Sequence, residues 1–162
     1  EINYLFDLLE NFLLKKINKL IDNKIKLKVM GNKKKFSHKL QKLLINSEKN
    51  TFINDKLQIN LALNYGSKEE LISAIKTINR NKKTINEKNI QENLYTKGIP
   101  DPDLLIRTGN TRRLSNFLLW QIAYTEIFFE KKLWPDFTKN DFKKILSNFK
   151  SSKRNFGGIL WV

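Results

Sequence analysis

Three of the chain's five arginines lie within seven residues, at Arg107, Arg112 and Arg113. Elsewhere the chain uses Lys at most basic positions, so Arg marks places where a planar, two-pronged donor is needed. Guanidinium groups bind carboxylates or phosphates through paired hydrogen bonds. Ser115 adds a hydroxyl group two residues after Arg113. The spacing therefore predicts an anion site of the size of a diphosphate.

The segments around these residues predict how they reach one edge of a sheet. The apolar run at 103–107 predicts a strand that ends at Arg107, and Thr108-Gly109 predicts a turn directly after it. A helix is expected at about 116–123. The free N–H groups at the start of that helix would face the same anion as the guanidinium groups.

A purely structural role for the same residues is equally open from their spacing. Ser115 or Asn116 could cap the expected helix. Arg107 could pair with Asp103 or Glu126 inside the fold. The two interpretations differ in whether the guanidinium groups have carboxylate partners.

Strand and helix patterns alternate along the rest of the chain. Strands are predicted at 25–30, 57–63 and 127–129, and helices at 2–21, 37–47, 67–78, 87–95 and 139–149. Ser37 is the expected cap of the second helix, and Ser67 and Glu70 form the expected capping box of the third. The alternation implies an α/β fold with a parallel sheet, whose ligands bind beyond the carboxyl ends of the strands. Asn64-Tyr65-Gly66 follows a strand in this way, as Arg107 does.

Composition excludes several kinds of chemistry. The 162 residues contain no Cys and a single His, His38, so disulfides, thiolate sites and cysteine nucleophiles are excluded, and His-based zinc clusters or triads have little to draw on. The shares of hydrophobic residues, 40%, and charged residues, 29%, predict one globular domain. No apolar run reaches the length of a membrane span and no signal peptide opens the chain, so a cytoplasmic location is expected.

The net charge of +15 suggests a nucleic-acid interface, but the basic residues are 26 Lys and only five Arg, which favours a solvated lysine surface. Nucleic-acid-binding proteins usually have Arg and exposed aromatic residues clustered on one element. The aromatic residues of this chain lie in apolar, periodic segments instead. Nucleic acid is therefore not an expected partner.

The segment from Asp103 to Glu126 resembles the cis-prenyltransferases of the undecaprenyl diphosphate synthase family. Three shorter motifs of that family occur in order around it: Asn64-Tyr65-Gly66, Leu133-Trp134-Pro135-Asp136-Phe137 and Phe156-Gly157-Gly158. The resemblance runs from Glu1 to about Gly158, nearly the whole chain.

The resemblance implies a mostly parallel central sheet flanked by helices. It also implies an enzyme that adds isopentenyl diphosphate repeatedly to an allylic diphosphate such as farnesyl diphosphate, with Mg²⁺ as cofactor. The product would be a long-chain polyprenyl diphosphate such as undecaprenyl diphosphate, a carrier of cell-wall sugars. Helix 2–21 resembles the family helix that lines the tunnel for the growing chain.

Site residues follow from the same resemblance, position by position. Arg107, Arg113 and Ser115 would hold the diphosphate of isopentenyl diphosphate, and Glu126 would act at the Mg²⁺ site. The expected supporting residues are Glu1, Asn64, Tyr65 and Gly66. A diphosphate reaction needs charge neutralisation by Arg and Mg²⁺ rather than a nucleophile, which agrees with the lack of Cys.

The chain departs from the family pattern at several places. The family's N-terminal phosphate-binding loop, which carries the catalytic Asp, would lie before Glu1, so residues 1–162 are expected to be a single, N-terminally truncated domain that is inactive alone. The first family strand and two helices would be missing with it. Asn110-Thr111 stands where the family has Gly-Glu, and Ser67 stands where it has a second Gly. Asn155-Phe156-Gly157 replaces Arg-Phe-Gly, with Arg154 one place early.

Partners are implied by the resemblance as well. A homodimer is expected, and contact with a membrane surface could arise through the lipid product. Two alternatives stay open: a non-catalytic partner subunit of a cis-prenyltransferase, and a basic nucleic-acid-binding domain.

Overall fold

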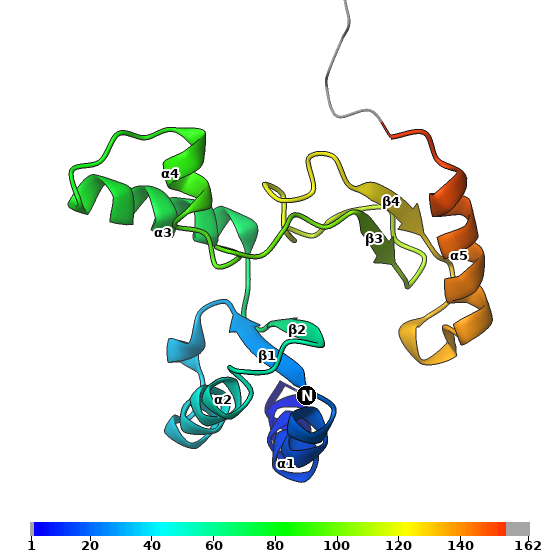
Figure 1. Cartoon of the computed structure of the whole chain (residues 1–162), viewed down its shortest axis with the longest axis horizontal. Helices are drawn as coiled ribbons and strands as arrows, with labels where there is room; N and C mark the ends of the chain where they lie inside the picture. Colours follow the sequence, from blue (N-terminus) through cyan, green and yellow to red (C-terminus); the bar gives the residue numbers. More distant parts are fainter. Residues whose placement is uncertain (1, 155–162) are drawn as a thin grey trace, which may run out of the picture. The chain divides into compact units, whose positions relative to one another are not determined.

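The computed structural model describes residues 2–154, which fold into two compact units. One unit comprises the residues up to Tyr65 together with Asn93–Tyr95. The other comprises Gly66–Glu92 and the described residues from Thr96 onward. Each unit contains one pair of parallel strands, β1–β2 in the first and β3–β4 in the second (Figure 1).

The first unit is a pair of parallel strands covered by two helices. Its elements are α1 (Ile2–Asp22), β1 (Ile25–Met30), the 3₁₀ turn η1 (Lys33–Lys35), α2 (His38–Asn50) and β2 (Leu57–Ala62). The register of β1 and β2 runs from Ile25↔Leu57 to Met30↔Ala62. Helices α1 and α2 pack against each other and against β1 (Figure 1).

The core of this unit follows from the three-and-four spacing of apolar residues on the two helices. Its buried members are Leu13, Leu27, Val29, Phe36, Leu40 and Leu44. The hydroxyl group of Ser37 accepts a hydrogen bond from the Leu40 N–H at 3.1 Å, so the predicted cap of α2 is confirmed. Gly31 ends β1 with φ +108°, and a Cβ there would lie 2.1 Å from the Leu63 carbonyl oxygen. Only Gly therefore fits this turn.

The second unit carries the remaining elements. They are α3 (Ser67–Arg80), α4 (Glu87–Gln91), β3 (Leu104–Arg107), β4 (Glu126–Phe129), the 3₁₀ turn η2 (Trp134–Asp136) and α5 (Lys139–Ser151). The strands pair in parallel from Leu104↔Glu126 to Arg107↔Phe129. Parallel strands alternating with helices confirm the predicted α/β class.

The predicted helix at 116–123 is wrong. The segment between β3 and β4 consists of turns, and Ser115, Asn116 and Leu118 have φ of 49°, 62° and 47°. A right-handed helix requires negative φ at every residue, so these three positions exclude it. The apolar periodicity of this segment therefore reflects burial within turns rather than one face of a helix.

The predicted capping box at the start of α3 is also wrong. The N-cap residue is Gly66, and Ser67 is already inside the helix. The Ser67 hydroxyl group instead accepts a hydrogen bond from the Leu119 N–H at 3.1 Å. Helix α4 is shorter than predicted and ends at Gln91, where the sequence pattern suggested residue 95.

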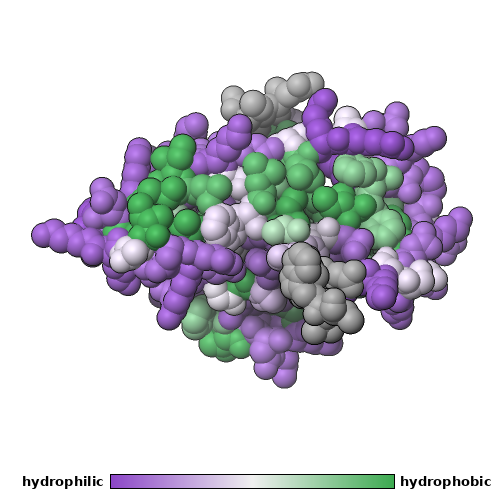
Figure 2. Space-filling model, turned by 90° about the horizontal axis from the view of Figure 1, so that it is seen from above, coloured by the Kyte–Doolittle hydropathy of each residue, from purple (hydrophilic) through white to green (hydrophobic). Residues whose placement is uncertain are grey.

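The surface mixes lysine-rich and apolar regions. Figure 2 shows green apolar residues lying among purple hydrophilic ones on the face in view. Trp134 is 73% exposed and stacks on Phe137 with ring centroids 6.1 Å apart. Within residues 2–154, no helix is both long enough and apolar enough to cross a membrane.

Candidate functional site

Arg107 lies at the carboxyl end of β3, as predicted, and the turn after it is held by the segment after β4. Gly109, with φ +91°, donates its N–H to the Lys132 carbonyl oxygen at 2.8 Å. Asn110 donates to the Glu130 carbonyl oxygen at 3.1 Å, and Glu130 donates to that of Arg107 at 2.7 Å. These backbone hydrogen bonds fix the chain direction directly after Arg107.

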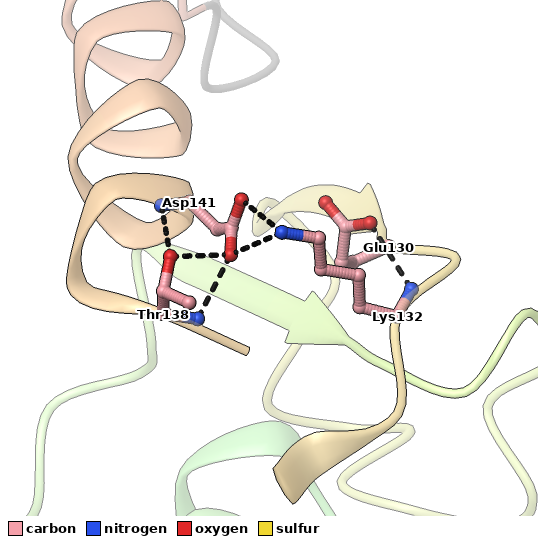
Figure 3. A network of polar contacts seen from close by, with 4 residues as sticks. All are labelled: Glu130, Lys132, Thr138 and Asp141. Carbon is pink, nitrogen blue, oxygen red and sulfur yellow. Dashed lines mark hydrogen bonds and ion pairs between the residues drawn. The ribbon is translucent and has the colours of Figure 1, made fainter. Parts of the chain in front are cut away.

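The segment after β4 is in turn linked to the start of α5. Figure 3 shows the Lys132 side chain reaching Asp141, whose two carboxylate oxygens each lie 2.8 Å from Lys132 Nζ. Thr138 and Asp141 form a capping box at the start of α5. The Lys132 ammonium group, together with Thr138, holds the pKa of the Asp141 carboxyl well below its usual range. The hydrogen bond to Asp141 raises the pKa of Lys132.

The guanidinium groups of the cluster have no carboxylate partner in the described part of the chain. Asp103, a candidate partner for Arg107, instead pairs with Arg154, with Oδ1 and Nη1 2.6 Å apart. Arg107 Nε donates to the Thr111 hydroxyl group at 3.2 Å. Across residues 2–154, no ion pair involves Arg107, Arg112 or Arg113. The interpretation in which these residues pair inside the fold is therefore not what the structure shows.

Arg113 and Ser115 lie exposed on the turn segment that follows Arg107. A cavity of about 180 Å³ lies beside Arg107 and is otherwise lined by apolar residues, namely Leu105, Ile106, Leu114 and Phe117. A half-buried guanidinium group next to an apolar cavity suits a ligand with a charged end and a hydrocarbon end.

In the described segment between β3 and β4 no helix begins, so the N-terminus that was predicted to face the anion is absent. Instead, the turn segment provides the cap of α3. Asn116 accepts hydrogen bonds from the Ser67 N–H through its carbonyl oxygen at 2.8 Å and from the Lys68 N–H through Oδ1 at 3.0 Å. A Cβ on Gly66 would lie 2.8 Å from Asn116 Nδ2, so Gly66 makes room for this contact.

Glu126, the predicted metal ligand, is the first residue of β4 and lies half-buried opposite Leu104. Its register position is three residues away from Arg107, which corresponds to about 10 Å along a parallel strand. Residues 2–154 contain no group of three or more His, Asp or Glu side chains that could hold a metal ion.

The remaining predicted site residues are Asn64, Tyr65, Gly66 and Glu1. Asn64 and Tyr65 belong to the first unit, where Asn64 (φ 46°) donates through Nδ2 to the Asn32 carbonyl oxygen at 2.9 Å. The Tyr65 ring packs edge-on against Tyr95, with centroids 6.3 Å apart. These contacts order the backbone and side chains within the first unit, and the predicted supporting roles stay predictions. Glu1 and the segment Asn155-Phe156-Gly157 lie outside the described residues.

Two contacts of the site were not predicted from the sequence. In the sequence, Thr111 is only a departure from a family pattern, yet its hydroxyl group is the hydrogen-bond acceptor for Arg107. The sequence suggests Asn116 as the cap of its own helix, but Asn116 instead caps α3, 48 positions earlier in the chain. The N-cap residue of α3 is Gly66, which has no side chain that could cap the helix. This Gly was the sequence signal that a residue distant in the chain provides the cap.

Known proteins resemble this chain over nearly all of its length. The family model of putative undecaprenyl diphosphate synthases matches residues 1–157. The isoprenyl transferase of Rickettsia typhi is 41% identical over 158 residues, which cover 97% of this chain and 70% of that relative. The isoprenyl transferase of Thermotoga maritima is 36% identical over 165 residues, which cover 99% of this chain and 71% of the relative.

Two crystal structures show the same fold. One is a probable undecaprenyl diphosphate synthase from Campylobacter jejuni, with a TM-score of 0.88, 38% identity, and 98% of this chain and 75% of the other covered. The other is lavandulyl diphosphate synthase from Lavandula x intermedia in complex with dimethylallyl diphosphate. Its TM-score is 0.91 at 31% identity, with 98% of this chain and 72% of the other covered.

Proposed function

The chain belongs to the undecaprenyl diphosphate synthase family of prenyltransferases, and on that premise we propose that it condenses isopentenyl diphosphate with an allylic diphosphate such as farnesyl diphosphate. Repeated condensation would give a long-chain polyprenyl diphosphate such as undecaprenyl diphosphate. The solved lavandulyl diphosphate synthase holds dimethylallyl diphosphate, which is itself an allylic diphosphate. That complex supports an allylic substrate for this chain.

The observation that carries the proposal is the unpaired state of the arginine cluster. Among the described residues, Arg107 and Arg113 have no carboxylate partner, and Arg107 lies beside an apolar cavity. Guanidinium groups without carboxylate partners, at and beyond the carboxyl end of a parallel strand, favour the binding of a diphosphate. Adjacent apolar walls favour a short hydrocarbon attached to that diphosphate.

The proposed roles follow from which bonds change. C4 of isopentenyl diphosphate forms a bond to C1 of the allylic substrate, the allylic diphosphate leaves, and a proton leaves C2 of isopentenyl diphosphate. The diphosphate of isopentenyl diphosphate remains in the product. Arg107, Arg113 and Ser115 are therefore proposed to bind and orient this substrate rather than to assist bond cleavage.

Mg²⁺ belongs to the proposal as the cofactor, with Glu126 as its candidate ligand in this chain. Mg²⁺ in phosphate-handling enzymes is held by one or two carboxylates plus substrate oxygens, and it would neutralise diphosphate charge. Glu126 would supply one carboxylate, and oxygens of the bound diphosphate would supply further ligands.

Finer features of the proposal rest on the family resemblance alone. They are a homodimeric state and contact with a membrane surface through the lipid product, whereas the proposed cytoplasmic location rests on the apolar pattern of the sequence. Asn64, Tyr65 and Gly66 are proposed to support the site, and Glu1 is proposed to help organise the isopentenyl diphosphate region. Residues 1–162 are proposed to belong to a single cis-prenyltransferase domain.

The test is a chain-elongation assay on the protein expressed from its complete reading frame. With farnesyl diphosphate, radiolabelled isopentenyl diphosphate and Mg²⁺, we expect labelled polyprenyl diphosphates, and their chain length is read by chromatography. Chelation of Mg²⁺ by EDTA should stop elongation, and added Mg²⁺ should restore it. A protein that gives no product alone but raises the turnover of a second prenyltransferase would instead be a non-catalytic partner subunit.

A further inference from the structure

A buried carboxylate and a buried amide join α3 to the turn segment that carries Arg113 and Ser115. Glu70 and Gln121 are each 1% exposed, although they are 51 positions apart in the chain. Gln121 Nε2 donates to Glu70 Oε2 at 3.2 Å and to the Thr96 hydroxyl oxygen at 3.0 Å. Burying a carboxylate is costly unless hydrogen bonds compensate it, so this pair is a specific arrangement rather than general packing.

The amide of Gln121 is oriented by its nitrogen alone. Gln121 Oε1 is buried and has no hydrogen-bond partner among the described residues. The acceptors Glu70 and Thr96 therefore determine which way the side chain points. Removing the charge on Glu70 should weaken this orientation of the Gln121 side chain.

Further contacts place the same segment on the helices of the second unit. The Leu119 N–H donates to the hydroxyl group of Ser67, which is fully buried, and the Asn116 carbonyl oxygen accepts from the Ser67 N–H at 2.8 Å. The Trp120 indole N–H donates to Gln91 Oε1 at 3.0 Å. These hydrogen bonds attach the segment to α3 and α4 at several points along its length.

The segment needs such support because its backbone is strained beside the site. Backbone φ is positive at Ser115, Asn116 and Leu118, and residues other than Gly rarely adopt positive φ. Conformations of this kind persist only where surrounding contacts hold them. The contacts to α3 begin at Asn116, directly after Ser115 and three residues after Arg113.

We propose that Glu70 and Gln121 are positioning residues for the proposed reaction, holding the turn segment so that Arg113 and Ser115 face isopentenyl diphosphate. This inference rests on the proposed function of those two residues. Neither Glu70 nor Gln121 touches the substrate; both act through the backbone of the segment between β3 and β4.

Reciprocal substitutions in the protein from the complete reading frame test the pair. Gln121→Glu places two carboxylates against each other in a buried site, and Glu70→Gln removes the charged acceptor. The double variant Glu70→Gln/Gln121→Glu restores one carboxylate and one amide with their positions exchanged. The Thr96 hydroxyl group can then donate where it previously accepted.

The expected readout separates substrate positioning from general stability. Gln121→Glu should raise KM for isopentenyl diphosphate about tenfold and change kcat less, and the double variant should recover most of that loss. KM for the allylic substrate should stay nearly constant in every variant. Glu69→Gln is the matched control, because Glu69 precedes Glu70 on α3 but is exposed.

Two further measurements keep the outcome decisive. If Gln121→Glu does not fold, Ser67→Ala removes the hydrogen bond to Leu119 without adding a charge and should raise the same KM about threefold. Isothermal titration of inorganic diphosphate reports anion binding without turnover. A wild-type protein that elongates prenyl chains, with the same KM in wild type, Gln121→Glu and Ser67→Ala, would overturn the positioning role. A wild-type protein without elongation or partner activity would overturn the proposed function itself.

Discussion

Arg107 is distinguished from the chain's many lysines by the shape of its side chain. Its Nε bonds to Thr111, which orients the planar guanidinium group and leaves its terminal nitrogens for a ligand. A Lys at this position would carry the same charge without the paired donors. The chemistry expected at this residue therefore depends on geometry as well as on charge.

Arg107→Lys tests that geometry. We expect KM for isopentenyl diphosphate to rise about tenfold, because the paired donors are lost while the charge remains, and kcat to fall less. Steady-state kinetics with a fixed allylic substrate measure both constants. Arg80→Lys, at the exposed last residue of α3, is the matched control and should leave both constants unchanged. Equal KM values for Arg107→Lys and wild type would remove the assigned role of Arg107.

At the scale of elements, the turn after β3 depends on the start of α5. The turn is bonded to the backbone of the segment after β4, and Lys132 of that segment is bonded to Asp141 in the capping box of α5. A helix cap therefore also orders the segment that supports Arg107. Caps of this kind stabilise the helix by satisfying N–H groups of its first turn.

The lowered pKa of Asp141 predicts how this link depends on pH. A carboxyl whose pKa is lower in the folded state stabilises that state above its unfolded pKa, at about pH 4, and loses this contribution as pH falls towards the folded pKa. Asp141→Asn should therefore be less stable than wild type at pH 6, and the difference should shrink below about pH 4. Because Lys132 is exposed and Asp141 is partly exposed, screening by salt should reduce the difference as well.

Urea unfolding of wild type and Asp141→Asn between pH 3 and pH 7, at low and high salt, would measure the difference in their free energies of unfolding. Asp55→Asn, an exposed carboxyl in the loop before β2, serves as the control. A difference between Asp141→Asn and wild type that is independent of pH would contradict the proposed contribution of the ionised carboxylate.

At the scale of the whole molecule, the net charge of +15 comes mostly from lysines spread over the sequence. Arginines able to bind a diphosphate account for a small part of it. The charge therefore attracts anions in general, while the proposed recognition of a diphosphate would depend on the site after β3.

A binding assay distinguishes this interpretation from a nucleic-acid function. At 0.15 M salt we expect an unrelated DNA duplex to bind more weakly than about 10 µM, with affinity falling steeply as salt rises, as for non-specific binding. Fluorescence anisotropy of labelled DNA provides the measurement. Binding tighter than that, with a clear preference between DNA sequences, would contradict the prediction.

Local patterns in the sequence predicted most of the elements. These patterns depend only on residues close in the chain: the three-and-four spacing in α1 and α2, the cap at Ser37 and the alternation in β1. The local apolar pattern at 103–107 likewise predicted a strand that ends at Arg107. The family, too, was evident from the order of residues between Asp103 and Glu126, and the comparisons confirm it.

The turn segment between β3 and β4 was decided only by the tertiary structure. Its apolar spacing matched a helix, but positive φ at Ser115, Asn116 and Leu118 forms turns instead. Ser67, which looked like a local cap, bonds to Leu119 about fifty positions away. Local propensities differ by less than about 1 kcal/mol for most residues, so contacts of this kind readily override them. Sequence alone therefore identified the residues proposed to bind a diphosphate, and the tertiary structure determined how α3 and α5 hold the turns that carry them.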